Sequence, residues 1–183
     1  MDSLPNLDAE ALGYRPALNV QFATDGDTRF IVDVDVTNEG NDHGLLAPLH
    51  QSIRDRYGKT PKNYLVDCGF NTKEDMTIVE QRGTQVYAPI HAAAQMLEKG
   101  NDPHARQRDD SNEMAQFRQR MATDNAKTLY QTRPTIAEFP NAVCRNHGLT
   151  PFRVRGQMKT KAVALWHALT HNLQRMMTLG WVT

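Results

Sequence analysis

The sequence contains few cysteines and no long apolar segment. Its 183 residues include only two cysteines, Cys68 and Cys144, too few for a disulfide framework or a four-thiolate zinc site, so we expect both to fill the core. No apolar run approaches the roughly 20 residues that cross a bilayer, and the start of the chain lacks the pattern of a secretory signal. The composition therefore predicts a folded, cytoplasmic protein with no membrane partner.

The chain also lacks net charge, but its charges are distributed unevenly. The 21 Lys and Arg residues balance the 21 Asp and Glu residues over the whole sequence. This balance indicates a surface with no strong overall preference for anions or cations. From Arg133 onward, however, Glu138 is the only acid, and it stands among seven basic residues: Arg133, Arg145, Arg153, Arg155, Lys159, Lys161 and Arg175. This basic end predicts a surface that contacts phosphates, and charge alone leaves a solvated helix face as the alternative.

The segment 17–90 alternates strand patterns with helix patterns. Residues 17–24 and 28–37 flank an Asp-Gly-Asp turn and predict a β-hairpin, with valines on a buried face and Asp33 and Asp35 on a polar face. The elements predicted to follow are a helix over 45–57, a strand over 64–66, a capped helix from Thr72 to Gly83 and a strand over 85–88. This alternation favours an α/β sheet with parallel pairing.

The rest of the chain is predicted to be mainly helical. We interpret 91–132 as a polar insertion with one helix near 112–122 that contributes little to the core. The apolar stripe of the helix predicted over 159–179 is expected to pack on the sheet. His167 and His171 lie four residues apart in that helix, a spacing that suits a metal ion, but no third ligand accompanies them and we expect packed or exposed histidines.

Carboxylates are the residues best placed to carry chemistry. Asp67 stands where a strand ends, and Glu138 lies on a helix after the polar insertion. Converging carboxylates hold Mg²⁺ or Mn²⁺ in many proteins that transfer phosphoryl groups. An aspartate at a strand end is more often a turn former or a cap, so the pattern alone leaves both roles open.

Several motifs resemble, in order, those of the DDE-type insertion-sequence transposases. The Val66-Asp67-Cys68-Gly69-Phe70-Asn71 segment is similar to the family's strand with the second catalytic aspartate. Tyr130, Arg133, Glu138 and Arg145 resemble the signature that carries the catalytic glutamate. The resemblance covers nearly the whole chain, because residues 13–21, 36–38, 42, 45 and 148–173 also match family motifs.

The resemblance implies a ribonuclease H-like α/β fold, with a mixed sheet flanked by helices, and a function in DNA transposition and DNA recombination. The implied reaction is metal-dependent phosphoryl transfer that cleaves DNA and joins strands. Asp67 is implied as the second acid and Glu138 as the third, both binding Mg²⁺ or Mn²⁺. Contacts to transposon-end or target DNA are implied for Tyr130, Arg133 and Arg145, and the basic Arg153, Arg155 and Lys159 are expected to add to them.

The sequence departs from the family's pattern at several positions. Four residues separate Arg133 from Glu138 where three are usual, Arg145 stands where lysine is usual, and Cys68 replaces a small residue. No strand carrying a first catalytic aspartate is predicted before residue 17. Of the other aspartates, Asp2 and Asp8 lie in an irregular lead, Asp25 is expected in a turn and Asp42 in a helix cap, and Asp33 or Asp35 could substitute for the first acid.

We therefore expect one partial DDE domain of a bacterial insertion-sequence transposase, truncated before its first strand. Its parts are an irregular lead (1–16), a hairpin and α/β unit (17–90), a polar insertion (91–132) and basic C-terminal helices (133–183). An unpaired strand edge favours aggregation or a homodimer.

Two functions remain open, a metal-dependent transposase and a catalytically inactive DNA-binding or dimerising remnant. We expect no detectable Mg²⁺-dependent cleavage or joining by the isolated chain, because the first acid has no match. A ribonuclease H-like host enzyme is disfavoured, because the resemblance follows transposase motifs beyond the fold.

Overall fold

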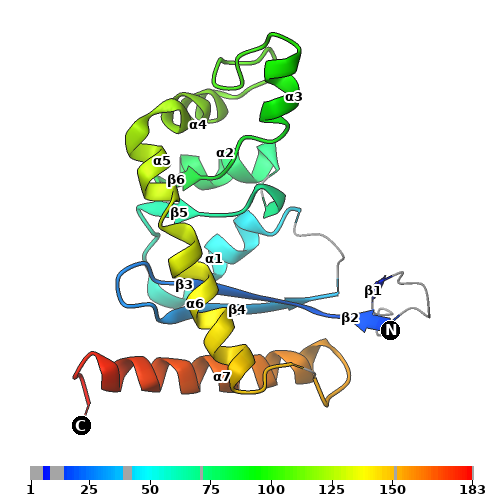
Figure 1. The fold of residues 1–183 in the computed structure, drawn as a ribbon, viewed down its shortest axis with the longest axis vertical. Helices are drawn as coiled ribbons and strands as arrows, with labels where there is room; N and C mark the ends of the chain where they lie inside the picture. The colour runs from blue at the N-terminus through cyan, green and yellow to red at the C-terminus, as the bar shows by residue number, and fades with distance from the viewer. Residues whose placement is uncertain (1–5, 9–14, 39–42, 71, 151, 183) are drawn as a thin grey trace. The chain divides into compact units, whose positions relative to one another are not determined.

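The computed structural model describes residues 6–8, 15–38, 43–70, 72–150 and 152–182 (Figure 1). The chain divides into two compact units. The first unit comprises Met1–Asn41 and Pro134–Thr183, and the second comprises Asp42–Arg133. The two units are described in turn.

The strands of the first unit form two antiparallel pairs. Strands β1 (Asn6–Asp8) and β2 (Arg15–Ala17) pair with each other, and β3 (Asn19–Thr24) and β4 (Ile31–Thr37) form the predicted hairpin. The turn of this hairpin is held by Asp25, whose Oδ2 accepts hydrogen bonds from the Thr28 N–H at 2.8 Å and the Thr28 hydroxyl at 2.6 Å. Asp25 is therefore a turn residue, as expected.

The pairing of β1 with β2 was not expected, because residues 1–16 were predicted to be an irregular lead. Local pattern signals strands through alternating apolar and polar residues, which this Pro- and Asn-containing segment lacks, whereas backbone pairing does not require that alternation. Asp8 ends β1, while Asp2 and Asp42 lie outside the described residues.

Strand β4 has buried residues on both of its faces, although one face was predicted to be polar. Val34 and Val36 are buried as expected, but Asp33 is also buried, with 2% of its surface exposed. The Oδ1 atom of Asp33 accepts the Val34 N–H at 2.9 Å, and Asp35 forms an ion pair of 2.9 Å with Lys161. Asp33 and Asp35 thus both have partners in the first unit, and the contrast between a buried valine face and a polar face is weaker than predicted, because residues on both faces of the strand are buried.

Two helices complete the first unit, α6 (Arg133–Asn146), which belongs to this unit from Pro134 onward, and α7 (Gln157–Thr178). Helix α7 packs against β4 with its small residues Ala164 and Ala168, and Asn172 exchanges two hydrogen bonds with the backbone of Ile31. The expectation that the whole apolar stripe of this helix packs on the sheet is wrong, because several of its large apolar residues are exposed: Leu165, Trp166, Leu169, Leu173 and Met177.

The second unit contains the predicted strand–helix–strand arrangement. Helix α1 (Leu46–Tyr57) leads into β5 (Asn63–Leu65), the short helix η1 (Cys68–Phe70), α2 (Lys73–Gln81) and β6 (Gln85–Tyr87). Strands β5 and β6 are parallel, as predicted. The side chain of Thr72 accepts the N–H of Asp75, which confirms the predicted cap of α2.

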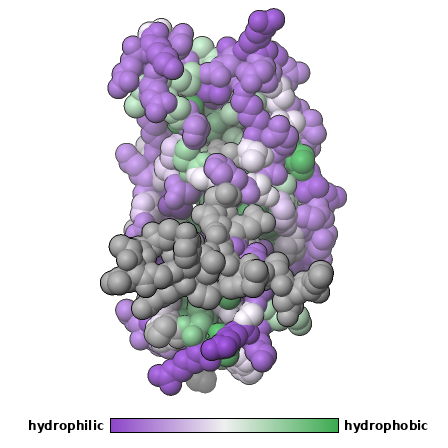
Figure 2. Space-filling view, turned by 90° about the vertical axis from the view of Figure 1, so that its right-hand side faces the viewer, coloured by the Kyte–Doolittle hydropathy of each residue, from purple (hydrophilic) through white to green (hydrophobic). Residues whose placement is uncertain are grey.

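Residues 91–132 form three helices, α3 (Ala93–Glu98), α4 (Asn112–Ala122) and α5 (Asp124–Tyr130). Helix α4 has the predicted bounds, but the expectation that this segment adds little to the core is wrong. Met114, Phe117 and Met121 are buried and pack in one cluster with residues of α1, α2 and β6. In the upper part of Figure 2, hydrophilic residues cover much of the surface around a smaller apolar area. The polar composition therefore describes the outer surface of these helices, and their inner side is apolar.

The described residues confirm an α/β fold. Their strands pair as three two-stranded sheets, β1–β2, β3–β4 and β5–β6, and not as the single mixed sheet that was expected. None of the described helices is both long enough and apolar enough to cross a membrane.

Candidate functional site

The candidate site begins with Asp67, directly after the carboxyl end of β5. Val66 extends the parallel pairing by donating its N–H to the Tyr87 carbonyl at 3.0 Å, and the chain then turns into η1. The turn is closed by the Phe70 N–H, which donates to the Asp67 carbonyl at 3.2 Å. The side chain of Asp67 is 58% exposed. The end of a short strand therefore presents a carboxylate to solvent.

Arg133, the first residue of α6, pairs with this carboxylate. The Nη2 atom of Arg133 lies 3.3 Å from Oδ2 of Asp67, and the other oxygen, Oδ1, accepts the Cys68 N–H at 3.0 Å. The guanidinium is less exposed than its partner, with 21% of the Arg133 side chain accessible. One carboxylate oxygen is thus held by the backbone and the other by a cation.

Tyr130, at the end of α5, fixes the same strand end from another direction. Its hydroxyl donates to the Val66 carbonyl at 3.2 Å. Burial raises the pKa of Tyr130, and the nearby Asp67 and Cys68 raise it further while Arg133 opposes them. The phenol therefore stays protonated at neutral pH and remains a hydrogen-bond donor.

Cys68 lies in the same group of residues and was not singled out as a site residue. It is half-buried, so the expectation that it fills the core holds only for Cys144, which is buried. Burial and the charge of Asp67 raise the pKa of the Cys68 thiol. A protonated thiol is a poor nucleophile, and Cys68 is therefore unsuited to covalent chemistry here. The one signal in the sequence that could have assigned Cys68 to this site is its position next to Asp67 in the chain.

The structure thus brings together three of the residues that the sequence singled out. We name Asp67, Cys68, Tyr130 and Arg133 the strand-end cluster. All four belong to the second unit and come from three places in the chain, the segment after β5, the end of α5 and the start of α6.

The other predicted site residues belong to the first unit. Glu138 lies in α6, and its side chain has no ion pair with another residue of the described segments. Its neighbour Phe139 packs against His171, with ring centroids 5.9 Å apart. Like Glu138, the remaining basic residues of the prediction are exposed: Arg145, Arg153, Arg155 and Lys159.

Of the two histidines noted in α7, His167 is half-buried and His171 has a structural role. His171 is buried, and its Nε2 lies 2.8 Å from the Arg29 carbonyl oxygen, which anchors α7 to the hairpin turn. Burial lowers the pKa of His171, so the ring is neutral near pH 7. This agrees with the expectation of packed histidines.

The donor chemistry of Asp67 and Glu138 suits a hard divalent cation such as Mg²⁺ or Mn²⁺, because both offer carboxylate oxygens. Both side chains are exposed, so a hydrated ion can reach either carboxylate. Within the described ranges, no group of three or more His, Cys, Asp or Glu side chains is placed to hold a metal ion.

Comparison with known proteins gives one finding about the family. Residues 6–173 match a family model described as "Transposase DDE domain". A search of curated proteins found no match, and neither did a search of solved structures.

Proposed function

The chain belongs to the transposase DDE-domain family, and from this premise we propose that it acts in DNA transposition by metal-dependent phosphoryl transfer. Proteins with this domain generally depend on a divalent metal. At the level of residues, the observation that carries the proposal is the strand-end cluster, in which an exposed carboxylate lies beside a guanidinium. That combination suits binding of a metal ion and a phosphate at one place.

Asp67 and Glu138 are the proposed metal-binding carboxylates. A bound Mg²⁺ or Mn²⁺ supplies positive charge that stabilises the reacting phosphodiester. The chain's own contribution at Asp67 is orientation, because the Cys68 N–H and the Arg133 guanidinium each fix one carboxylate oxygen. No residue of the cluster is needed as a covalent nucleophile.

Arg133 is the proposed phosphate ligand of the cluster. One of its terminal nitrogens contacts Asp67, and its fork-shaped guanidinium has further donors that can bind phosphate oxygens. Tyr130 is a positioning residue in this proposal, because its hydroxyl is engaged with the Val66 carbonyl and so holds the strand end that presents Asp67. Its contact with DNA stays a prediction.

Transposon-end and target DNA are the proposed partners. The basic residues Arg145, Arg153, Arg155 and Lys159 are exposed, which leaves their cationic groups accessible to DNA phosphates. An insertion-sequence origin, a ribonuclease H-like arrangement and a homodimer stay with this proposal as predictions. The exposed apolar residues of α7, Trp166 and Leu169 among them, supply surface through which two copies could associate.

A DNA-binding protein that does not cleave is the second candidate. The observation that favours it is the Asp67–Arg133 ion pair, because the guanidinium occupies an oxygen that a metal ligand would use. The two candidates share DNA binding and differ in cleavage, so one set of assays separates them.

The test measures DNA binding and DNA cleavage by the full chain. We expect the chain to bind a DNA duplex with an affinity that falls as the salt concentration rises. In R153Q/R155Q/K159Q, the slope of log affinity against log salt concentration should be smaller by about one unit for each lost phosphate contact. The matched control is K99Q/R108Q/K127Q, which removes the same charge from the second unit. If the two triple variants changed the salt dependence equally, duplex binding would depend on the net charge of the chain and not on the position of these basic residues.

Cleavage is measured in the same preparation with Mg²⁺ or Mn²⁺. The sequence predicts no detectable cleavage by the isolated chain, and cleavage that is lost in both Asp67→Ala and Glu138→Ala would overturn that prediction and support the enzyme. Binding without cleavage supports the second candidate. Absence of duplex binding at low salt contradicts both.

A further inference from the structure

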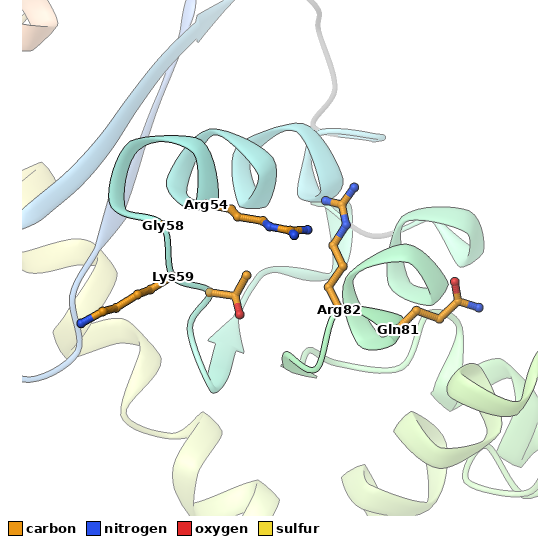
Figure 3. A pocket seen from close by; sticks show the side chains of 6 residues that line it. Arg54, Gly58, Lys59, Gln81 and Arg82 are labelled. Carbon is orange, nitrogen blue, oxygen red and sulfur yellow. The ribbon is translucent and has the colours of Figure 1, made fainter.

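A second polar site lies in the same unit, at the opposite end of its parallel strands. An open pocket of about 690 Å³ is lined by Arg54, Gly58, Lys59, Thr60, Gln81 and Arg82 (Figure 3). These residues come from the ends of α1 and α2 and from the segments that lead into β5 and β6. Asp67, by contrast, follows the carboxyl end of β5. We name this pocket the arginine pocket, after Arg54 and Arg82; Lys59 is its third cation.

Two cations converge in this pocket. Figure 3 shows the side chains of Arg54 and Arg82 pointing toward one another from the two helices, whereas Lys59 and Gln81 extend from the rim. Both guanidinium groups lie close enough to the buried His50 to affect it. Burial lowers the pKa of His50, and the positive charges of Arg82 and Arg54 lower it further. Like charges repel, so a bound anion between the two guanidinium groups would lower the electrostatic energy of this arrangement.

The two arginines lack protein partners over the part of the chain that the structure describes. Neither guanidinium forms an ion pair there, and the Nη1 atom of Arg82 is buried with no hydrogen-bond partner. A buried donor without a partner is unfavourable, and a bound oxygen atom would satisfy it.

Two carboxylates next to pocket residues in the chain or bonded to one have amide partners. Asp55, next to Arg54 in the chain, accepts a hydrogen bond from Gln51 at 2.6 Å. Glu113 accepts one from Gln81 at 3.2 Å. Neither of these two carboxylates forms an ion pair with Arg54 or Arg82.

The ends of α1 and α2 offer a simpler role for basic residues. Helix carboxyl ends carry partial negative charge, which favours a cation in the last turn. That interaction is favourable for Arg54 in the last turn of α1, and a cation at a helix end can also hydrogen-bond the last carbonyls. No such bond from Arg54 or Arg82 occurs among the described residues. Their donors are thus left for a ligand.

We propose that the arginine pocket binds a phosphate group. Arginine is the side chain best suited to phosphate, because its planar donors contact two oxygens at once. The pocket is open and leaves room beside a phosphate for the rest of a larger molecule, and we consider two sources of the group, a nucleic-acid strand and a free nucleotide. This inference does not depend on the function proposed for the strand-end cluster.

The test is an amide-resolved NMR titration of the full chain, first with inorganic phosphate and then with a nucleoside diphosphate and a short DNA duplex. We expect saturable shifts at the amides of Gly58, Lys59, Thr60 and Arg82, and affinity at least tenfold weaker in R54Q/R82Q. The variant R54K/R82K keeps both charges and is expected to bind with intermediate affinity. The matched control, K99Q/R108Q, loses the same charge outside the pocket and is expected to bind like the wild type.

The three ligands distinguish the source of the phosphate. Tighter binding of the duplex, lost in R54Q/R82Q, assigns the pocket to a nucleic-acid strand, and tighter binding of the diphosphate assigns it to a nucleotide. Shifts elsewhere in the chain, no saturable shift with any ligand, or equal losses in R54Q/R82Q and K99Q/R108Q would overturn the proposal. Failure of DNA cleavage would not affect it, because no step of the test requires catalysis.

Discussion

Arg133 Nη2 lies 3.3 Å from Asp67 Oδ2, although 66 positions separate the two residues in the chain. The contact joins the first residue of α6 to the turn that follows β5. Because the Asp67 side chain is 58% exposed, water screens the pair and its contribution to stability is small. The pair orients the Asp67 carboxylate and the Arg133 guanidinium, the two groups with roles in the proposed function.

Replacement of Asp67 by Asn is expected to leave the fold almost as stable as before. An exposed ion pair contributes about 0–1 kcal/mol, so the free energy of unfolding should fall by less than about 1 kcal/mol in urea denaturation. Asp124→Asn is the matched control, because that side chain is 97% exposed and pairs with Lys127 at 3.2 Å. A loss of several kcal/mol in Asp67→Asn alone would make Asp67 a structural residue.

Replacement of Tyr130 by Phe is expected to lower the free energy of unfolding by about 1 kcal/mol, because the hydrogen bond to the Val66 carbonyl is lost. The raised pKa of Tyr130 also predicts a pH dependence. The neutral phenol contributes stability that is fully present below the usual tyrosine pKa near 10, and that is lost as pH rises toward the higher pKa of the folded state. Between about pH 9 and 11 the wild type should therefore lose more stability than Tyr130→Phe. Parallel losses in the two proteins would contradict the burial of this hydroxyl.

Asp110 is expected to be a structural carboxylate of the second unit. Its side chain is fully buried and lies 2.7 Å from Nε of Arg118, which is itself 6% exposed. Removing one partner of a buried pair leaves an uncompensated charge, so Asp110→Ala should lower the free energy of unfolding by about 3–5 kcal/mol. Asp109→Ala, at a neighbouring carboxylate that is 73% exposed, is the control and should leave the free energy of unfolding nearly unchanged.

The same carboxylate predicts a sensitivity to acid. Burial alone would raise the pKa of Asp110, but hydrogen bonds from Gln107, Lys73 and Arg118 outweigh it and hold the pKa below the usual value. Asp110 therefore contributes stability that is present above the ordinary pKa near 4 and is lost as pH falls through the lower pKa of the folded state. Urea denaturation between about pH 2 and 6 measures it. A wild type whose stability varies with pH no more than that of Asp110→Asn would contradict this prediction.

Local signals in the sequence predicted the elements that are determined locally. The β3–β4 hairpin follows from its Asp25 turn, and the start of α2 follows from the Thr72 cap, because each depends on residues within a few positions. The bounds of α4 were predicted for the same reason. The strand-end cluster was anticipated only through a family resemblance, because nothing local relates Tyr130 or Arg133 to Asp67.

Features that depend on packing could not be predicted from pattern. The average polarity of 91–132 conceals Met114, Phe117 and Met121, which share one side of α4 and are buried. The burial of Asp33 and the exposure of Trp166 depend likewise on which neighbours cover each face. The arginine pocket was missed because Arg54 and Arg82 are far apart in the sequence and meet only through the packing of α1 against α2.

The most direct test of the proposed function is Mn²⁺-induced broadening of amide NMR signals in the full chain. We expect broadening at Cys68 and around Glu138 at low Mn²⁺ concentration. The broadening at Cys68 should disappear in Asp67→Asn, and the broadening around Glu138 should disappear in Glu138→Gln. Asp124→Asn should change neither, because its exposed carboxylate has no proposed role. Broadening that persists at Cys68 in Asp67→Asn, or that appears only elsewhere in the chain, would contradict the assignment of these two carboxylates as metal ligands.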